Sequence, residues 1–161
     1  SPHDIPRIDA DLARYASLCE TSTGRSCAEL PGAGAAGGMG FACTAFLNAE
    51  LLPGVDIVLD AAGIDAALQG ASFAVTGEGR IDAQTAMGKA PGGVARRAAA
   101  HGCRTIAFAG CIGRGAREVN THGIDAFFPI LRSPCSMEEA MEPQRAREAL
   151  ADTAEQLFRL V

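Results

Sequence analysis

Residues 72–94 read Ser-Phe-Ala-Val-Thr-Gly-Glu-Gly-Arg-Ile-Asp-Ala-Gln-Thr-Ala-Met-Gly-Lys-Ala-Pro-Gly-Gly-Val. A short apolar run, Phe73–Val75, stops at Thr76 and is followed by a charged, glycine-rich loop over residues 77–89. After Pro91 an Arg- and Ala-rich segment predicts a helix. The order strand, glycine-rich loop, helix is typical of the carboxyl edge of an open α/β sheet, which is where such sheets bind ligands.

The loop contains the only lysine of the chain, Lys89, among 14 Lys and Arg residues. A compact ammonium group suits a phosphate oxygen approached from one side, whereas arginine offers a planar fork. The alternative is a solvated surface lysine without a ligand, because lysine side chains are usually exposed.

Composition narrows the class of protein. A chain of 161 residues with 48% hydrophobic and 20% charged residues fits one packed domain or pieces of two small ones. Its net charge of −5 argues against nucleic acid as a partner, since phosphate backbones require a basic face. The sequence shows neither a signal peptide nor an apolar run of the roughly 20 residues that a membrane span needs. We therefore expect a soluble, cytoplasmic protein without a membrane partner.

The cysteines form no Cys-x-x-Cys pair, and the three histidines fit no metal spacing. In a cytosolic chain of this length we expect reduced cysteines, several of them in the core, and not a disulfide framework or a zinc site.

The pattern of apolar residues changes near residue 71. Before it, the spacing predicts helices over residues 9–19 (with Asp9 as N-cap), 34–50, 55–61 and 64–68. After it, apolar runs at 73–76, 105–109 and 126–130 alternate with helical stretches at 91–101 and 114–121, and two helices follow at 137–141 and 145–160. The alternation predicts parallel βαβ units. Three strands make a small sheet, so we interpret it as the second half of a doubly wound α/β domain.

A second glycine-rich motif, residues 32–37, satisfies the dinucleotide pattern G-x-G-x-x-G. That pattern has force only after a strand within a βαβ unit, and residues 26–30 are at best a weak strand. We therefore favour close helix packing, a hinge, or a backbone approach to a substrate anion at a helix N-terminus over an NAD site.

Six motifs in order resemble the glycerate kinase type 1 family: residues 31–41, 46–51, 76–85, 88–91, 106–110 and 122–128. The resemblance implies transfer of the γ-phosphoryl group of ATP to a hydroxyl of D-glycerate with Mg²⁺. It also implies a flavodoxin-like α/β domain interrupted by a restriction-enzyme-like domain, with the active site between them. Residues 1–71 would then be part of the mostly helical inserted domain, and residues 72–161 the C-terminal half of the flavodoxin-like domain.

The family is longer than this chain, which resembles only its C-terminal part. Segments that would contribute strands and polar groups to the site are missing, so the resemblance leaves open whether this chain acts alone.

Residue chemistry assigns candidate roles within this framework. Glycine N–H groups, cations and hydroxyls bind phosphate, and carboxylates bind Mg²⁺ or accept a proton. The candidate catalytic residues are Asp82 and Lys89, and the candidate metal ligands are Glu78 and Asp82. The nucleotide candidates are Gly77, Gly79, Arg80, Gln84, Thr85 and Gly88, and the substrate candidates are Gly34, Gly37, Gly38 and Glu78.

Alternatives to these roles remain. In one alternative, the charged residues form ion pairs, Glu78–Arg80 and Asp82–Lys89, that only shape the loop. A second alternative concerns Gly110 and Gly113, which either close a tight turn, as we favour, or line a nucleotide site. In a third, the whole chain is a non-catalytic module that binds nucleotide or carboxylate, or that forms a homodimer over its exposed sheet.

Overall fold

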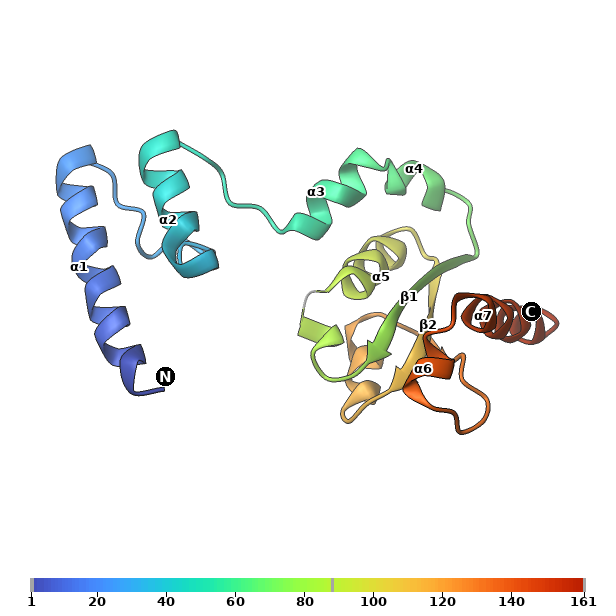
Figure 1. The fold of residues 1–161 in the computed structure, drawn as a ribbon. Coiled ribbons are helices and arrows are strands. Elements are labelled where there is room, and N and C mark those ends of the chain that lie inside the picture. Colours follow the sequence, from blue (N-terminus) through green and yellow to red (C-terminus); the bar gives the residue numbers. More distant parts are fainter. Residues whose placement is uncertain (1, 88, 161) are drawn as a thin grey trace. The chain divides into compact units, whose positions relative to one another are not determined.

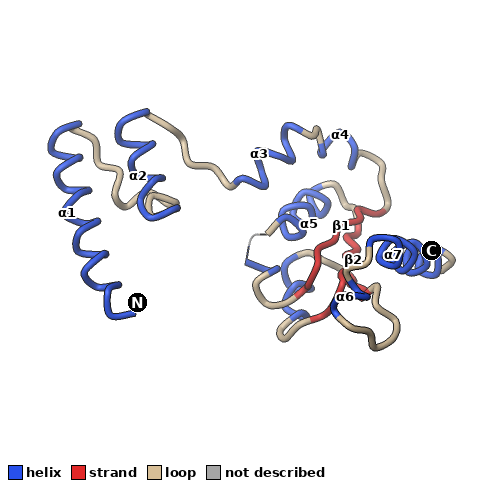
Figure 2. The backbone as a smooth tube through the Cα atoms, in the orientation of Figure 1, coloured by secondary structure: helices blue, strands red, loops and turns tan. Residues whose placement is uncertain are grey.

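The computed structural model describes residues 2–87 and 89–160, and the chain divides into two compact units, residues 1–53 and 54–161. Figure 1 shows a helical first unit and a second unit that contains the sheet. Figure 2 marks the same segments by secondary structure. Each unit is described by itself.

The first unit is built on two helices, α1 (Ile5–Thr23) and α2 (Ala35–Leu47), after a short 3-10 turn, η1 (Pro2–Asp4). Its small core lies between them and consists of Cys19, Cys27, Ala33, Phe41 and Ala45. The predicted start of α1 at Asp9 is wrong, because the helix begins four residues earlier with proline in its first turn, a position that proline tolerates well. Asp9 therefore lies inside α1.

The glycine-rich start of α2 has a distorted backbone. Gly34 is the N-cap, and Ala36, Gly37 and Gly38 follow with φ of 51°, 67° and 95°. Glycine suits positions 37 and 38 because side chains rarely adopt this left-handed conformation, which Ala36 adopts in spite of its side chain. Residues 25–34 form loop and turns without a strand, so the G-x-G-x-x-G pattern lacks the context that dinucleotide binding requires.

The second unit holds a parallel sheet of order β1-β2-β3, made of β1 (Phe73–Ile81), β2 (Arg104–Ile112) and β3 (Ala126–Pro129). The predicted α/β class with parallel strands is confirmed. The first two strands are longer at their carboxyl ends than predicted. Their pairing continues through Ile81↔Ile112, beyond the apolar residues that identify the strands in the sequence.

The two faces of the sheet pack against different helices. Ala107 and Ala109 of β2 lie in one cluster with Ala95 of α5 (Ala90–Ala100) and with Val119 of η3 (Ala116–His122). Alternate residues point to opposite faces of a strand. Accordingly, Phe108 lines a cavity of about 510 Å³ on the other side, between the sheet and α7 (Pro143–Phe158).

The remaining elements of this unit are α3 (Gly54–Ala61), α4 (Ile64–Leu68), η2 (Thr85–Met87) and α6 (Met137–Ala140). Although α3 and α4 precede β1 in the sequence, their contacts place them in the same compact unit as residues 72–161. The predicted domain boundary near residue 71 concerns a longer protein and stays a prediction.

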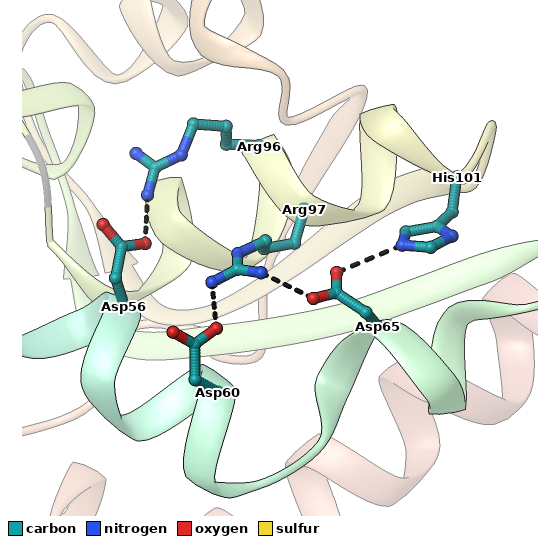
Figure 3. A network of polar contacts seen from close by, with 6 residues as sticks. All are labelled: Asp56, Asp60, Asp65, Arg96, Arg97 and His101. Carbon is teal, nitrogen blue, oxygen red and sulfur yellow. Dashed lines mark hydrogen bonds and ion pairs between the residues drawn. The ribbon is translucent and has the colours of Figure 1, made fainter.

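Ion pairs join α3 and α4 to α5, as Figure 3 shows. Arg97 pairs with Asp60 and, at 2.5 Å, with Asp65, which also lies 3.1 Å from Nε2 of His101. Among the described residues, Arg96 pairs only with Asp56. The pKa of Arg97 is raised, chiefly by its hydrogen bond to Asp60. These pairs connect the two short helices to α5.

All six cysteines lie in the described part of the chain as free thiols, and three of them, Cys19, Cys27 and Cys103, are buried. No helix among residues 2–87 and 89–160 has the length and apolar character needed to cross a membrane.

A carboxylate stabilises the turn after α1. Oε1 of Glu20 accepts hydrogen bonds from the backbone N–H groups of Cys27, at 2.7 Å, and Ala28, at 2.9 Å, and these bonds lower the pKa of Glu20. Because the pKa of Glu20 is lower in the folded protein, its ionised carboxylate stabilises the fold fully at pH values above the ordinary glutamate pKa of about 4.3. This stabilisation is lost as the pH falls through the lower pKa of the folded state. We expect the protection factors of the Cys27 and Ala28 amides, which are exchange rates corrected for the intrinsic pH dependence, to fall on acidification in the wild type. In Glu20→Gln these protection factors should change much less with pH. Equal pH dependence in both proteins would contradict this role.

The polar network in Figure 3 generates a second expectation. Arg97→Met removes a cation that has two carboxylate partners and a side chain only 24% exposed. Arg96→Met removes a cation that has a single described carboxylate partner and a side chain 59% exposed. Because exposed single pairs contribute little, we expect the Arg97 variant to unfold at lower urea concentration than the Arg96 variant, and the difference to shrink in high salt. Equal midpoints would show that the network does not hold α3 and α4.

Candidate active site

The candidate site forms where β1 ends and the chain turns into α5. Glu78 and Arg80 are strand residues, paired in register with Ala109 and Cys111, so the predicted loop start at Gly77 is wrong. The turn proper begins at Asp82, and the Asp82 carboxylate accepts the N–H of Gln84 at 2.9 Å. The site therefore combines rigid strand residues with a tight turn.

Thr85 connects the Glu78 carboxylate to the backbone of Asp82. Its side chain is fully buried, and its hydroxyl donates to Oε1 of Glu78 while accepting the N–H of Asp82 at 3.1 Å. The Thr85 N–H also donates to the carbonyl of Asp82 at 3.0 Å. Sequence reasoning assigned Thr85 to the nucleotide and missed this connection. Seven residues separate it from Glu78, so no local spacing rule reveals the contact.

Each carboxylate also faces one cation. Nζ of Lys89 lies 3.9 Å from Oε2 of Glu78, and Nε of Arg80 lies 3.5 Å from Oδ2 of Asp82. The ion pairs proposed as the structural alternative, Glu78–Arg80 and Asp82–Lys89, are wrong in their partners. The turn folds Asp82 back toward Arg80, and the chain then returns Lys89 to the strand beside Glu78. Both cations keep about half their side-chain surface exposed, 43% for Lys89 and 62% for Arg80.

Two glycines of the site are explained by strand packing. A Cβ at Gly77 would lie 2.7 Å from the carbonyl oxygen of Phe108, and one at Gly110 would lie 2.6 Å from that of Gly79. Glycine at these positions lets β1 and β2 approach at their carboxyl ends. A ligand role for Gly77 and Gly79 stays a prediction.

The structure brings together Glu78, Arg80, Asp82, Thr85 and Lys89. The backbone of Gln84 contributes to the turn, and its exposed side chain stays a candidate ligand. Gly88 lies outside the described residues. Gly34, Gly37 and Gly38 belong to the first unit, and their contact with substrate stays a prediction.

The donor set suits Mg²⁺ better than a transition metal. Residues 2–87 and 89–160 contain no group of three or more His, Cys, Asp or Glu side chains placed to hold a metal. Mg²⁺ does not need such a cage, because one or two carboxylates, waters and substrate phosphates complete its shell. Glu78 and Asp82 supply two carboxylates, and the buried Thr85 hydroxyl ties the Glu78 carboxylate to the backbone of Asp82, which fits that requirement.

Comparison with known proteins adds independent information. The model of the glycerate kinase family matches residues 1–161. The chain belongs to the glycerate kinase family.

A glycerate kinase of Halalkalibacterium halodurans is 46% identical over 138 residues, covering 86% of this chain and 36% of that protein. A glycerate 2-kinase of Escherichia coli is 40% identical over 136 residues, which cover 84% of this chain and 36% of that protein. A crystal structure from Salmonella typhimurium LT2, assigned as a glycerate kinase 2, is 37% identical with a TM-score of 0.65, covering 98% of this chain and 42% of its own. The chain thus spans 36–42% of the length of these glycerate kinase family members.

Two buried threonines provide a matched test of the Thr85 connection. Thr85→Val removes the hydroxyl that donates to Oε1 of Glu78 and accepts the Asp82 N–H, so we expect a loss of about 1–3 kcal/mol in the free energy of unfolding. Thr105 is equally buried, but its hydroxyl has no partner among the described residues. Thr105→Val should therefore be neutral or stabilising in urea denaturation. Equal losses in both variants would contradict the connecting role of Thr85.

Proposed function

We propose that this chain is the C-terminal part of an ATP-dependent D-glycerate kinase, and that the Glu78–Thr85–Asp82 cluster with Lys89 forms part of its active site. Family membership supports the reaction class, and the arrangement of two carboxylates and two half-exposed cations at one sheet edge supports the location. Phosphoryl transfer requires mainly positioning and neutralisation of charge, which this residue set provides.

Lys89 and Arg80 are the proposed phosphate contacts. Lys89 is the N-cap residue of α5, where the helix dipole adds positive potential to that of the ammonium group. The glycines at 77, 79 and 88, with Gln84, are proposed to complete the nucleotide site, while the buried Thr85 positions Glu78 from within the fold. Strand pairing and the hydrogen bond from Thr85 position the Glu78 carboxylate, and Lys89 lies beside it.

Asp82 is the proposed base or metal partner, and Glu78 the proposed metal or substrate contact. As a base, Asp82 takes the proton of the attacking glycerate hydroxyl while the oxygen–phosphorus bond forms and the bond to the ADP leaving group breaks. Bound Mg²⁺ would offset the charge of the phosphate oxygens. The name of the Escherichia coli relative supports the 2-hydroxyl as the acceptor.

The proposed architecture of the longer protein follows the family resemblance. Residues 72–161 would complete a flavodoxin-like domain, and residues 1–71 would belong to a restriction-enzyme-like insertion. Gly34, Gly37 and Gly38 would then present backbone N–H groups to the glycerate carboxylate. We propose a cytoplasmic enzyme whose partners are small molecules, with a homodimer as the assembly to test.

Kinetics of the longer protein test this proposal. We expect ATP-dependent phosphorylation of D-glycerate, with Asp82→Asn lowering kcat by roughly 100-fold or more, the usual contribution of a general base. Lys89→Ala should lower kcat/KM for ATP by at least about tenfold, because a charge contact to phosphate is lost. Asp152→Asn removes an exposed carboxylate that pairs with Arg132 at 3.7 Å, and it is the control expected to leave kinetics unchanged. Full activity of the Asp82 variant would remove that residue from the mechanism.

A further inference from the structure

The turn that carries Asp82 is held by a second segment, residues 113–115, which follows β2. The N–H of Gly113 donates to the carbonyl of Ile81 at 2.7 Å, and the N–H of Ala83 donates to the carbonyl of Arg114 at 3.2 Å. These two backbone hydrogen bonds run in opposite directions and lie on either side of Asp82. They fix the backbone of the residue between them.

Gly113 also sets the space available to the Asp82 side chain. A Cβ at this position would lie 2.9 Å from Cβ of Asp82 and 2.7 Å from Nε of Arg80. The arginine end is flexible and can move aside. Cβ of Asp82 cannot move easily, because the Asp82 N–H is bound to Thr85 and the carboxylate accepts the N–H of Gln84.

The requirement for glycine at 113 is steric and not conformational. Gly113 does not have positive φ, so the backbone would tolerate an alanine. Gly115, two residues later, has a φ of 73° and also faces Ala83, where an added Cβ would lie 2.8 Å from that of alanine. Of the two, Gly113 therefore gives the cleaner substitution.

We propose that Gly113 is a positioning residue of the active site: its missing side chain lets the 113–115 segment lie against the turn and holds the Asp82 carboxylate beside Arg80. This inference rests on the proposed function, because it assigns Gly113 a role through Asp82. It also replaces the alternatives that Gly113 merely closes a turn or touches nucleotide.

Single variants of the longer protein give the first test. Gly113→Ala should lower kcat for glycerate phosphorylation by about 10- to 100-fold, since small displacements of a catalytic group have effects of this size. KM for glycerate should change less than threefold, whereas KM for ATP should rise moderately, because the added Cβ also displaces Arg80, a proposed phosphate contact. Gly54→Ala is the matched control: a Cβ there meets nothing within 4 Å and φ is not positive, so kinetics should not change.

A double-mutant cycle separates positioning from general damage. If Gly113 acts through Asp82, Gly113→Ala should have little further effect on kcat in the Asp82→Asn background, measured in single turnovers at high enzyme concentration. Kinetics are taken at a temperature at which the circular dichroism of every variant matches that of the wild type. That condition keeps loss of folding out of the comparison.

The outcomes distinguish this inference from the proposed function. Three results would overturn the positioning role while leaving the kinase assignment intact. They are an unchanged kcat in Gly113→Ala, a loss expressed only in KM for ATP, and effects of Gly113→Ala and Asp82→Asn on kcat that multiply in the double variant. A fully active Asp82→Asn would instead overturn the assigned role of Asp82 and this inference with it. Absence of glycerate phosphorylation by the wild-type longer protein would overturn the proposed function itself.

Discussion

Parallel pairing of β1 with β2 is the constraint on which the candidate site depends. Two parallel neighbours cannot be joined by a hairpin, so the chain must leave the carboxyl end of β1, cross over through α5 and re-enter at the start of β2. The crossover places the turn at residues 82–85 and the start of α5 at one sheet edge. Lys89 consequently faces Glu78 although eleven positions separate them.

Much of the fold was predictable because its periodicity is local. Alternating apolar runs and helical stretches identified the three strands, and the pairing confirmed them as parallel. Element ends were less predictable, since Gly77–Arg80 look like loop in the sequence and become strand only through hydrogen bonds to β2. The start of α1 was misplaced because a proline in a first turn resembles a break.

The candidate site was predictable in composition but not in connectivity. The residue types of the loop pointed to Glu78, Asp82 and Lys89, and the structure brings these side chains into one cluster. Which cation faces which carboxylate depends on the direction of the turn, which no spacing rule supplies. The buried hydroxyl of Thr85 and the close approach of Gly113 are tertiary contacts, visible only once β2 lies beside β1.

The outer edge of β1 has a consequence for handling this polypeptide. In the described part of the chain β1 pairs with β2 alone, and its nine residues lack proline and place Val75 about half exposed on that edge strand. An open strand of this kind templates intermolecular β-pairing. We therefore expect recombinant preparations of this polypeptide by itself to self-associate through that edge.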